Sequence, residues 1–486
     1  MAEDTLASSP EIIVGSLPLD ERCNILFIMA DQFRHDALHH VGGYGRTDAL
    51  DSLAAEGVSF HGAVTTSPEC IPARFALASG LYPHQTGVWR NGPVTLSPSA
   101  WTWTRALVAA GYRTSVFGKT HFHEAAQASG DLRDGIDLMR GYGLLDVDEI
   151  AGPRASMLMR CTMTESWQQL GLWEAYRRDF EERFAGKAWI AKPSPLGLEH
   201  YYDTYVGRRA LEYLSAYDRP EPWFCWVSFA GPHEPWDAPS PYDRLHSASD
   251  MPRPIPRMGG SDSARGLLSD LFREPAHAAP TGESEIAALR SNYAGNVTLI
   301  DDQIGTIIDL LKKSSVYDNT LVLFTSDHGE MNGDHGLIYK GNFLASAVDI
   351  PFIVRPPKGG VANQLGTADT LVELIDVGTT ILDYAGVGWP KWSNGRSLRP
   401  ILEGRSEAHR AFVVSEFGGH TMLATSNWKC EFDPHGEPVI LFDRAADPFE
   451  QHNLVAVEGL NEMLDQLQGM LVAHRNATAG QHKITL

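Results

Sequence analysis

The sequence predicts an α/β fold built on a large, mixed but mostly parallel sheet flanked by helices, followed by a smaller C-terminal α+β region. Two observations carry this prediction. Helix-like segments alternate several times with short apolar runs that end in polar residues, which is typical of buried parallel strands. After about residue 385, strand-like pieces instead follow one another closely, and a helical tail comes last.

The first strand is expected at Asn24–Gln32, where an apolar run ends in Asp and Gln. A helix-like pattern follows over residues 47–60 and is interrupted by Gly57. Helix-then-strand patterns recur over residues 101–124, 205–236 and 288–330. In the C-terminal region, strands are expected over residues 411–417, 420–432 and 437–443, and a helix over residues 461–475.

These patterns divide the chain into three parts: a tail (1–21), an α/β domain (22–384) and an α+β subdomain (385–486). Two segments break the α/β pattern. Residues 131–200 are irregular and rich in Met, Trp and Arg, and residues 238–285 are rich in Pro, Ser and Gly. We expect both to be insertions over the strand ends, where pocket walls and lids often lie.

Composition excludes several classes of protein. A hydrophobic content of 43% and a charged content of 21% are typical of a soluble globular protein, and no apolar run is long enough to span a membrane. The net charge of −21 argues against nucleic acid as a partner. The acidic N-terminus does not resemble a secretory signal. Five scattered cysteines argue against a disulfide framework, so a cytoplasmic location is expected.

The stretch SPECIPARFALASG places a thiol at the start of a predicted helix. Pro72 suits the first turn of a helix, and Gly80 is a plausible stop. Cys70 would then lie where unpaired backbone donors favour an anion, with Arg74 one turn away on the same face. A small buried cysteine beside a surface arginine explains these residues equally well at this point.

Polar residues gather after the predicted strands, where sites form in open α/β sheets. They are Asp31 and Gln32, Lys119 and His121, His233, and Asp327 and His328, with Lys340 in the following loop. Each alone has an ordinary interpretation as a helix cap or a solvated charge. Together, their oxygens suit a hard cation such as Ca²⁺, Mg²⁺ or Mn²⁺, and their cations suit a tetrahedral oxyanion, sulfate or phosphate.

Four ordered motifs resemble the sulfatase family of the alkaline phosphatase superfamily. CIPAR matches the C-x-P-x-R signature, and GYRTSVFGK matches the second signature. DNTLVLFTSDHG resembles the second metal-binding strand, and LFDRAADPFEQHNL resembles the closing element. The resemblance extends from about Asn24 to Leu454 and implies an alkaline-phosphatase-like fold.

The resemblance also implies a modified nucleophile. In the family, a formylglycine-generating enzyme oxidises the signature cysteine, here Cys70, to formylglycine (3-oxoalanine). Its hydrate is a geminal diol, which Arg74 would hold. One hydroxyl would attack sulfur and displace the alcohol, and deprotonation of the other would expel sulfate and restore the aldehyde. The generating enzyme would be a transient partner, and the substrate a small sulfate ester: aryl, alkyl or sugar sulfate.

Other roles follow from the matched positions. One divalent metal, Ca²⁺ before Mn²⁺ or Mg²⁺, would be bound by Asp31, Gln32, Asp327, His328 and the modified Cys70. Lys119 and Lys340 would clamp the sulfate oxygens. His233 would protonate the leaving alcohol, and His121 would be the base for collapse of the diol. Asn91 resembles a polar, substrate-binding residue of the pocket.

The metal pairs depart from the commonest pattern, because Asp-Gln and Asp-His replace Asp-Asp and Asp-Asn. These pairs also occur in choline-sulfatase-like and phosphonate-monoester-hydrolase-like relatives, so a phosphonate monoester or phosphodiester hydrolase is the alternative. The intact Gly-Lys-x-His of GKTH favours sulfate. A sulfate-ester-binding protein with an unmodified Cys70 and a two-zinc phosphatase are further alternatives. The natural substrate is left open, as is whether the chain forms a homo-oligomer.

Overall fold

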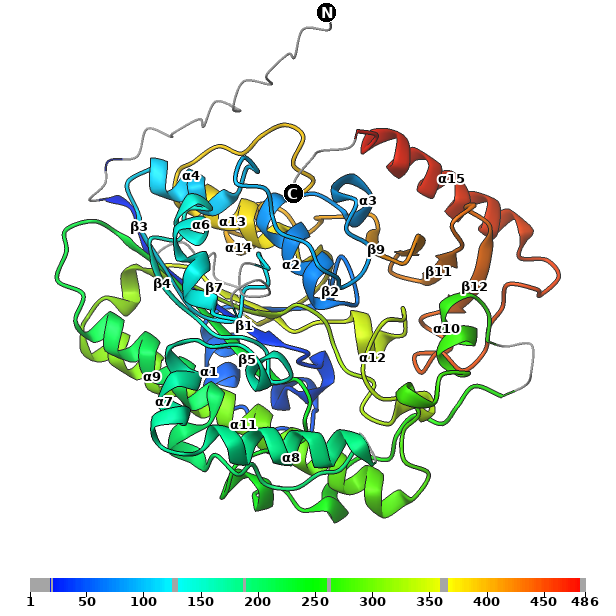
Figure 1. Cartoon of the computed structure of the whole chain (residues 1–486). Helices are drawn as coiled ribbons and strands as arrows, with labels where there is room; N and C mark the ends of the chain where they lie inside the picture. The colour runs from blue at the N-terminus through cyan, green and yellow to red at the C-terminus, as the bar shows by residue number, and fades with distance from the viewer. Residues whose placement is uncertain are drawn as a thin grey trace, which may run out of the picture.

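An eight-stranded sheet forms the centre of the protein, seen in a computed structural model that describes residues 18, 21–124, 130–186, 189–259, 264–358 and 366–480 (Figure 1). The strand order is β4-β3-β5-β1-β6-β7-β2-β8. The strands are β1 (Asn24–Asp31), β2 (Val58–Val64), β3 (Arg113–Gly118), β4 (Asp146–Glu149), β5 (Trp223–Pro232), β6 (Thr320–Ser326), β7 (Phe352–Arg355) and β8 (Gly366–Glu373). The expected tail, residues 1–21, lies almost entirely outside the described residues.

The pairing within this sheet is parallel with one exception. Strand β1 pairs in parallel with β5 and β6, and β3 does so with β4 and β5. Strand β7 runs antiparallel to both of its neighbours, β6 and β2. The prediction of a mixed, mostly parallel sheet is therefore confirmed.

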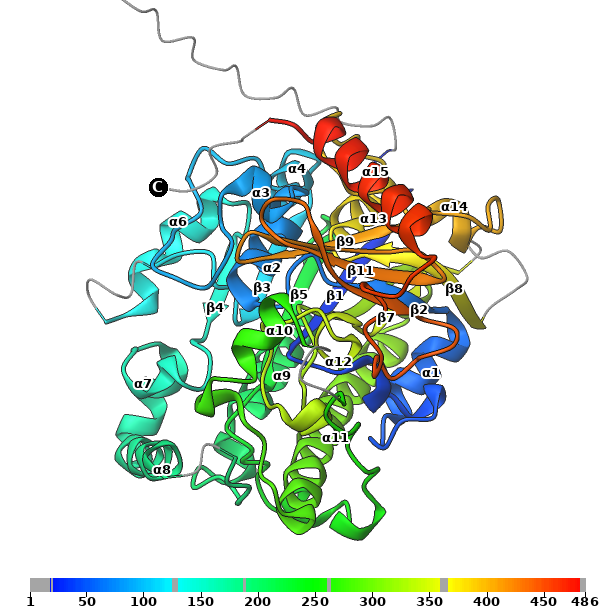
Figure 2. The ribbon, with the colours of Figure 1, turned by 90° about the vertical axis from the view of Figure 1, so that its right-hand side faces the viewer.

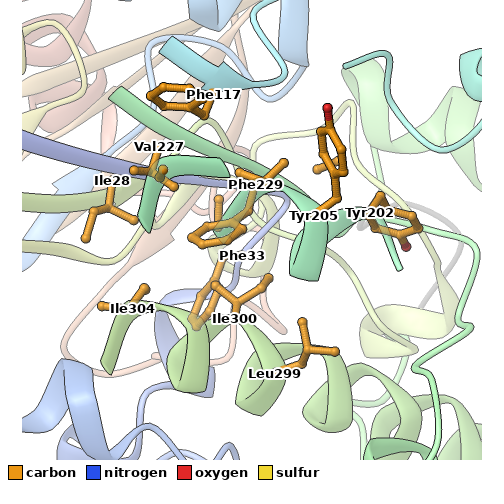
Figure 3. Close-up of a cluster of buried hydrophobic side chains, with 14 of the residues drawn as sticks. Ile28, Phe33, Phe117, Tyr202, Tyr205, Val227, Phe229, Leu299, Ile300 and Ile304 are labelled. Carbon is orange, nitrogen blue, oxygen red and sulfur yellow. The ribbon is translucent and has the colours of Figure 1, made fainter. Parts of the chain in front are cut away.

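Helices cover both faces of the sheet. Successive side chains of a buried strand point to opposite faces, so each strand contributes to two cores. In β1, Leu26 and Ile28 belong to one core, and Ile25 and Phe27 belong to the other. Helices α1 (Asp48–Glu56), α9 (Tyr202–Ser215) and α11 (Glu283–Lys313) contribute to the first core, and Figure 3 shows part of it. Helices α2 (Cys70–Ser79), α4 (Trp103–Ala109) and α13 (Asp376–Tyr384) contribute to the second, on the opposite side of the sheet in Figure 1.

The two segments expected to be insertions carry regular structure. Residues 131–200 contain α6 (Ile136–Gly141), α7 (Thr162–Gln169) and α8 (Trp173–Ala185), and they also supply the edge strand β4. The irregular composition of this segment therefore does not place all of it outside the sheet. Residues 238–285 are mostly loop and short 3-10 turns around α10 (Gly266–Leu271). Short helices α3 (Pro83–Thr86), α12 (Ala345–Val348) and α14 (Arg399–Leu402) lie in other connections.

A second, four-stranded antiparallel sheet follows in the order β12-β11-β10-β9. Its strands are β9 (Val413–Phe417), β10 (His420–Ala424), β11 (Trp428–Phe432) and β12 (Pro438–Asp443). Helix α15 (Asn461–Ala477) packs Leu467 and Leu471 against Leu423 and Leu441 of this sheet (Figure 2). The smaller α+β region expected from the sequence is thus present.

Candidate active site

Four adjacent strands deliver the candidate residues to one edge of the sheet. In the order β3, β5, β1 and β6, they are parallel neighbours, so their carboxyl ends meet at the same edge. Lys119 directly follows β3, His233 follows β5, Asp31 ends β1, and Asp327 follows β6. The sheet topology therefore brings together side chains that are far apart in the sequence.

Helix α2 places Cys70 at this edge. The helix begins at Cys70 and ends at Ser79, and the next residue, Gly80, caps it with a left-handed φ of 72°, in agreement with the stop that the sequence predicts. Gly118, the last residue of β3, is needed for a close backbone contact. A Cβ atom at this position would lie only 1.8 Å from the backbone oxygen of Ser228. The glycine of the GYRTSVFGK motif thus permits the close approach of β3 to β5 that positions Lys119.

Four buried groups converge at the centre of the site. One ligand atom from each of Asp31, Cys70, Asp327 and His328 lies within 4.8 Å of the other three. Cys70 Sγ is 3.1 Å from His328 Nε2 and 3.7 Å from Asp31 Oδ1. His328 Nδ1 donates to the carbonyl oxygen of Gly329 at 2.9 Å, which leaves the Nε2 lone pair facing the cluster.

This donor set fits a divalent cation. Two carboxylates and an imidazole whose lone pair faces the cluster are suitable ligands for a hard or borderline metal, and no side chain of the four is more than 1% exposed. The thiol of Cys70 stands where the hydroxyl oxygens of a hydrated formylglycine would be. Gln32 adjoins the cluster, because its backbone nitrogen donates to Asp327 Oδ1 at 3.0 Å.

Two buried cations bind the carboxylates of the cluster. Arg74 Nε donates to Asp327 Oδ2 at 2.8 Å, and its Nη2 donates to Asp31 Oδ2 at 3.2 Å. Lys119 Nζ also donates to Asp31 Oδ2, and it lies 4.0 Å from Cys70 Sγ. Burial alone would raise the pKa of Asp31, but the nearby cations, Lys119 foremost, hold it well below its ordinary value. Asp31 is therefore ionised and available to a metal.

Two acidic residues that the sequence analysis did not single out hold the Gln32 side chain. Its amide nitrogen donates to Glu234 Oε2 at 3.0 Å and to Glu330 Oε2. Its carbonyl oxygen accepts a hydrogen bond from Lys340 Nζ. Because the nitrogen lies between two carboxylates and the oxygen faces a cation, the orientation of the amide is determined. Burial, together with Glu234, raises the pKa of Glu330 to about 7.

His121 and His233 lie at the wall of the site, whereas His328 belongs to the cluster. His233 Nδ1 donates to the backbone oxygen of Glu234 at 2.8 Å, which leaves Nε2 for a substrate. His121 lines the same cavity as Cys70, and its buried Nδ1 has no hydrogen-bond partner among the described residues. Burial lowers the pKa of His121 well below its ordinary value, and Lys119 lowers it further. His121 is therefore neutral and able to accept a proton.

Asn91 makes hydrogen bonds near the start of α2, in addition to its predicted role in binding substrate. Its side-chain oxygen accepts from the backbone nitrogen of Ile71 at 2.8 Å, in the first turn of α2. Its own backbone nitrogen donates to Glu69 Oε2 at 2.6 Å. A contact with substrate would therefore come from the side-chain nitrogen of Asn91.

Two residues of the site have left-handed backbone conformations. The φ angle is 68° at Gln32 and 61° at His121. Such angles are uncommon for residues other than glycine, and they cluster at functional sites. Gln32 directly follows β1, and His121 lies in the loop three residues after the end of β3.

A cavity of about 880 Å³ opens onto the cluster. Cys70, Lys119, His121, His233 and Lys340 line its floor, together with Asn91. Its outer wall includes apolar side chains, among them those of Met157, Leu158, Leu267, Leu271 and Phe417. The volume lies within the range of small-molecule sites, so the cavity can hold an organic group as well as an oxyanion.

Comparison with known proteins identifies the family. Residues 23–387 match the family model described as Sulfatase. The chain belongs to the sulfatase family. Residues 333–477 also match a model described as the C-terminal region of N-sulphoglucosamine sulphohydrolase. The sulfatase is therefore a sulfuric ester hydrolase, as predicted.

Curated relatives match this chain over most of their length. The sulfatase is 28% identical to an arylsulfatase of Clostridium perfringens, over 92% of this chain and 93% of that one. It is 30% identical to the multifunctional alkaline phosphatase superfamily protein PehA of Trinickia caryophylli, over 82% and 80% of the two chains. It is 29% identical to the choline-sulfatase of Rhizobium meliloti, over 89% and 82%.

Solved structures confirm the alkaline-phosphatase-like fold. The phosphonate monoester hydrolase of Agrobacterium radiobacter superposes with a TM-score of 0.74 at 24% identity, covering 94% of this chain and 96% of that one. A putative sulfatase of Bacteroides thetaiotaomicron superposes with a TM-score of 0.67 at 21% identity, covering 94% and 93%. Among the described residues, no helix has both the length and the apolar character that crossing a membrane requires.

Proposed function

We propose that the sulfatase cleaves small sulfate monoesters with a formylglycine formed from Cys70 and one bound divalent metal. The observation that carries this proposal is the buried convergence of Cys70, two carboxylates and His328 beneath a cavity with cationic walls. The Cys-x-Pro-x-Arg sequence around Cys70 supports its conversion by a formylglycine-generating enzyme. The hydrated formylglycine would supply the attacking hydroxyl.

The metal would be held by Asp31, Gln32, Asp327 and His328, with the modified Cys70 as a further ligand. When bound, it would lower the pKa of the attacking hydroxyl and withdraw charge from the sulfate oxygens. We propose Ca²⁺, because the ligands are mostly oxygen atoms, with Mn²⁺ or Mg²⁺ as alternatives. The contacts of Gln32 with Glu234 and Glu330 support its place in this set, since they orient the amide.

Two cations, Lys119 and Lys340, would receive the sulfate group. Lys119 and Lys340 both line the cavity beside Cys70, so their ammonium groups can bind sulfate oxygens and the charge that develops on them. Arg74 is completely buried and bonded to both carboxylates, so it would position the modified residue and not bind substrate directly.

The two histidines would transfer protons in opposite directions. His233 Nδ1 is bonded to a backbone oxygen, so a proton on Nε2 can pass to the leaving alcohol. His121 is neutral because burial and neighbouring cations lower its pKa, so it can take a proton from the second hydroxyl of the hydrate. Expulsion of sulfate would then regenerate the aldehyde.

Replacement of His233 by alanine is expected to slow substrates with poor leaving groups far more than substrates with good ones. An alkyl sulfate should lose about 10²–10⁴-fold in kcat/KM, because its alkoxide needs a proton as the bond breaks. Nitrophenyl sulfate should lose about tenfold or less, because nitrophenolate is stable without protonation. Steady-state kinetics on both substrates provide the measurement, and equal losses would remove His233 from the acid role.

The proposed reaction is tested by two measurements on one preparation. The mass of the peptide containing Cys70 should be about 18 Da lower than that of the unmodified thiol. The same preparation should show a higher kcat/KM for an aryl sulfate than for an aryl phosphonate ester. A peptide of unmodified mass in fully active enzyme would exclude formylglycine, and the opposite order of kcat/KM would favour the phosphonate monoester hydrolase function.

We also propose a cytoplasmic location for the sulfatase. All five cysteines are buried and free, which suits a reducing compartment.

A further inference from the structure

The cavity is larger than the sulfate group requires. Its volume of about 880 Å³ leaves room for the alcohol portion of the substrate between the cluster and the outer wall. The chemistry of that wall therefore indicates which alcohol the sulfatase accepts. Two arginines, Arg90 and Arg154, line the wall in addition to the catalytic cations.

Both guanidinium groups are exposed and held by stacking on aromatic rings. Arg90 lies 4.4 Å from the ring centre of Phe417, and Arg154 lies 4.6 Å from that of Phe184. Within the described part of the chain, neither guanidinium makes a hydrogen bond or an ion pair. Stacking fixes the plane of an arginine while leaving its five donors available, which prepares it for a planar or tetrahedral anion.

The acidic residues of the same wall, in contrast, already have partners. Glu69 accepts from the backbone nitrogen of Asn91 at 2.6 Å. Glu274 pairs with His277 at 3.0 Å. Asp270 lies 3.7 Å from Arg273. Glu234, which also lines the cavity, accepts from the Gln32 amide, and its charge interacts with that of Arg154. Arg90 and Arg154 are therefore the charged side chains of the outer wall that have neither a hydrogen bond nor an ion pair among the described residues.

Both arginines are attached to segments that touch the catalytic floor. Arg90 precedes Asn91, which is bonded to the backbone beside Cys70. Arg154 follows Gly152 by two residues, and a Cβ atom at Gly152 would lie 3.1 Å from Lys119 Nζ. The segment that carries Arg154 therefore adjoins the lysine that would bind the sulfate.

We propose that Arg154 and Arg90 form a subsite for a second anionic group on the alcohol portion of the substrate, a carboxylate or a second sulfate. This inference rests on the proposed function, because the sulfate that is cleaved must occupy the catalytic floor. The apolar residues Leu267 and Leu271 of the same wall would contact the ring or chain that joins the two anions. The substrate class is thus a dianionic sulfate ester.

Three phenyl sulfates that differ in one ring substituent provide the test: a carboxylate, a sulfonate that imitates a second sulfate, and an uncharged carboxamide. With the wild-type sulfatase, kcat/KM should be at least about tenfold higher for one of the anionic compounds, the effect of one charged hydrogen bond. Whichever anion is preferred identifies the natural group. The double variant Arg90→Gln/Arg154→Gln should lose this preference. Arg178→Gln, an exposed arginine of α8 outside the cavity lining, should retain it.

Binding separates a failure of the subsite from a failure of the proposed reaction. Calorimetry on the Cys70→Ala variant measures the dissociation constants of the same three compounds without turnover. The anionic compound should bind about tenfold more tightly than the carboxamide, and the two arginine substitutions should abolish the difference. Equal binding of anionic and uncharged compounds, or a preference that survives both substitutions, would overturn the subsite even in a fully active enzyme.

Discussion

Replacement of Cys70 by alanine is expected to abolish hydrolysis of aryl sulfates while leaving the fold intact. The loss in kcat should reach roughly 10⁴-fold or more, because the variant has no group from which the nucleophile can be made. The side chain is 1% exposed, and the hydrogen-bond partners of its sulfur are polar groups of the site, so its removal deletes one small atom from the cluster. The measurement is the rate on nitrophenyl sulfate, with circular dichroism to verify the fold.

Cys430→Ala is the matched control for that experiment. Cys430 is equally buried, but it lies in β11 of the second sheet, in the core beneath α15. Its removal should lower stability by about 1 kcal/mol, the cost of a small buried group, and leave activity unchanged. Activity of Cys70→Ala within tenfold of wild type would contradict the whole nucleophile assignment.

Replacement of Arg74 by methionine is expected to destabilise the fold by about 3–5 kcal/mol, because it leaves two buried carboxylates without their shared partner. Arg74 and both carboxylates are completely buried, so water cannot replace the lost hydrogen bonds. Activity should fall as well, because Asp31 and Asp327 would no longer be held in place. Urea unfolding monitored by fluorescence gives the stability, and nitrophenyl sulfate hydrolysis gives the activity.

Arg355→Met separates the two effects. Arg355 is also nearly buried, but it donates to the backbone oxygens of Tyr317 and Thr320, at the opposite end of β6 from the site. The Arg355→Met variant should be less stable than wild type, but its folded fraction should keep the wild-type activity. If Arg74→Met were as stable as wild type, the buried pairs with Asp31 and Asp327 would not be the interactions that hold the cluster.

Much of the fold is predictable because the residues near the site obey local rules. The apolar run at Asn24–Asp31, the proline in the first turn of α2 and the stop at Gly80 each act over a few residues. The edge strand β4 was not predictable in this way, since three of its four residues, DVDE, are acidic and the segment becomes a strand only by pairing with β3. The antiparallel β7 likewise depends on its partners.

The same division applies to the site. Residues that follow strands, such as Asp327, could be collected because parallel strands share an edge. Glu330 and Glu234 could not, although each lies close in the sequence to a candidate residue, because their role depends on where the Gln32 amide turns. Arg154 lies in a segment without periodicity, and only the folded chain brings it to the cavity.

The left-handed residues Gln32 and His121 have a consequence for engineering. A non-glycine residue in this conformation costs about 1 kcal/mol, which glycine would recover. At Gln32 the buried hydrogen bonds of the amide outweigh this gain, but the ring of His121 makes no hydrogen bond among the described residues. Selection for heat resistance alone would therefore favour glycine at His121 and enrich stable but inactive proteins. Any such selection must be coupled to sulfate release, because the most heat-resistant sequence would lack a side chain that the reaction needs.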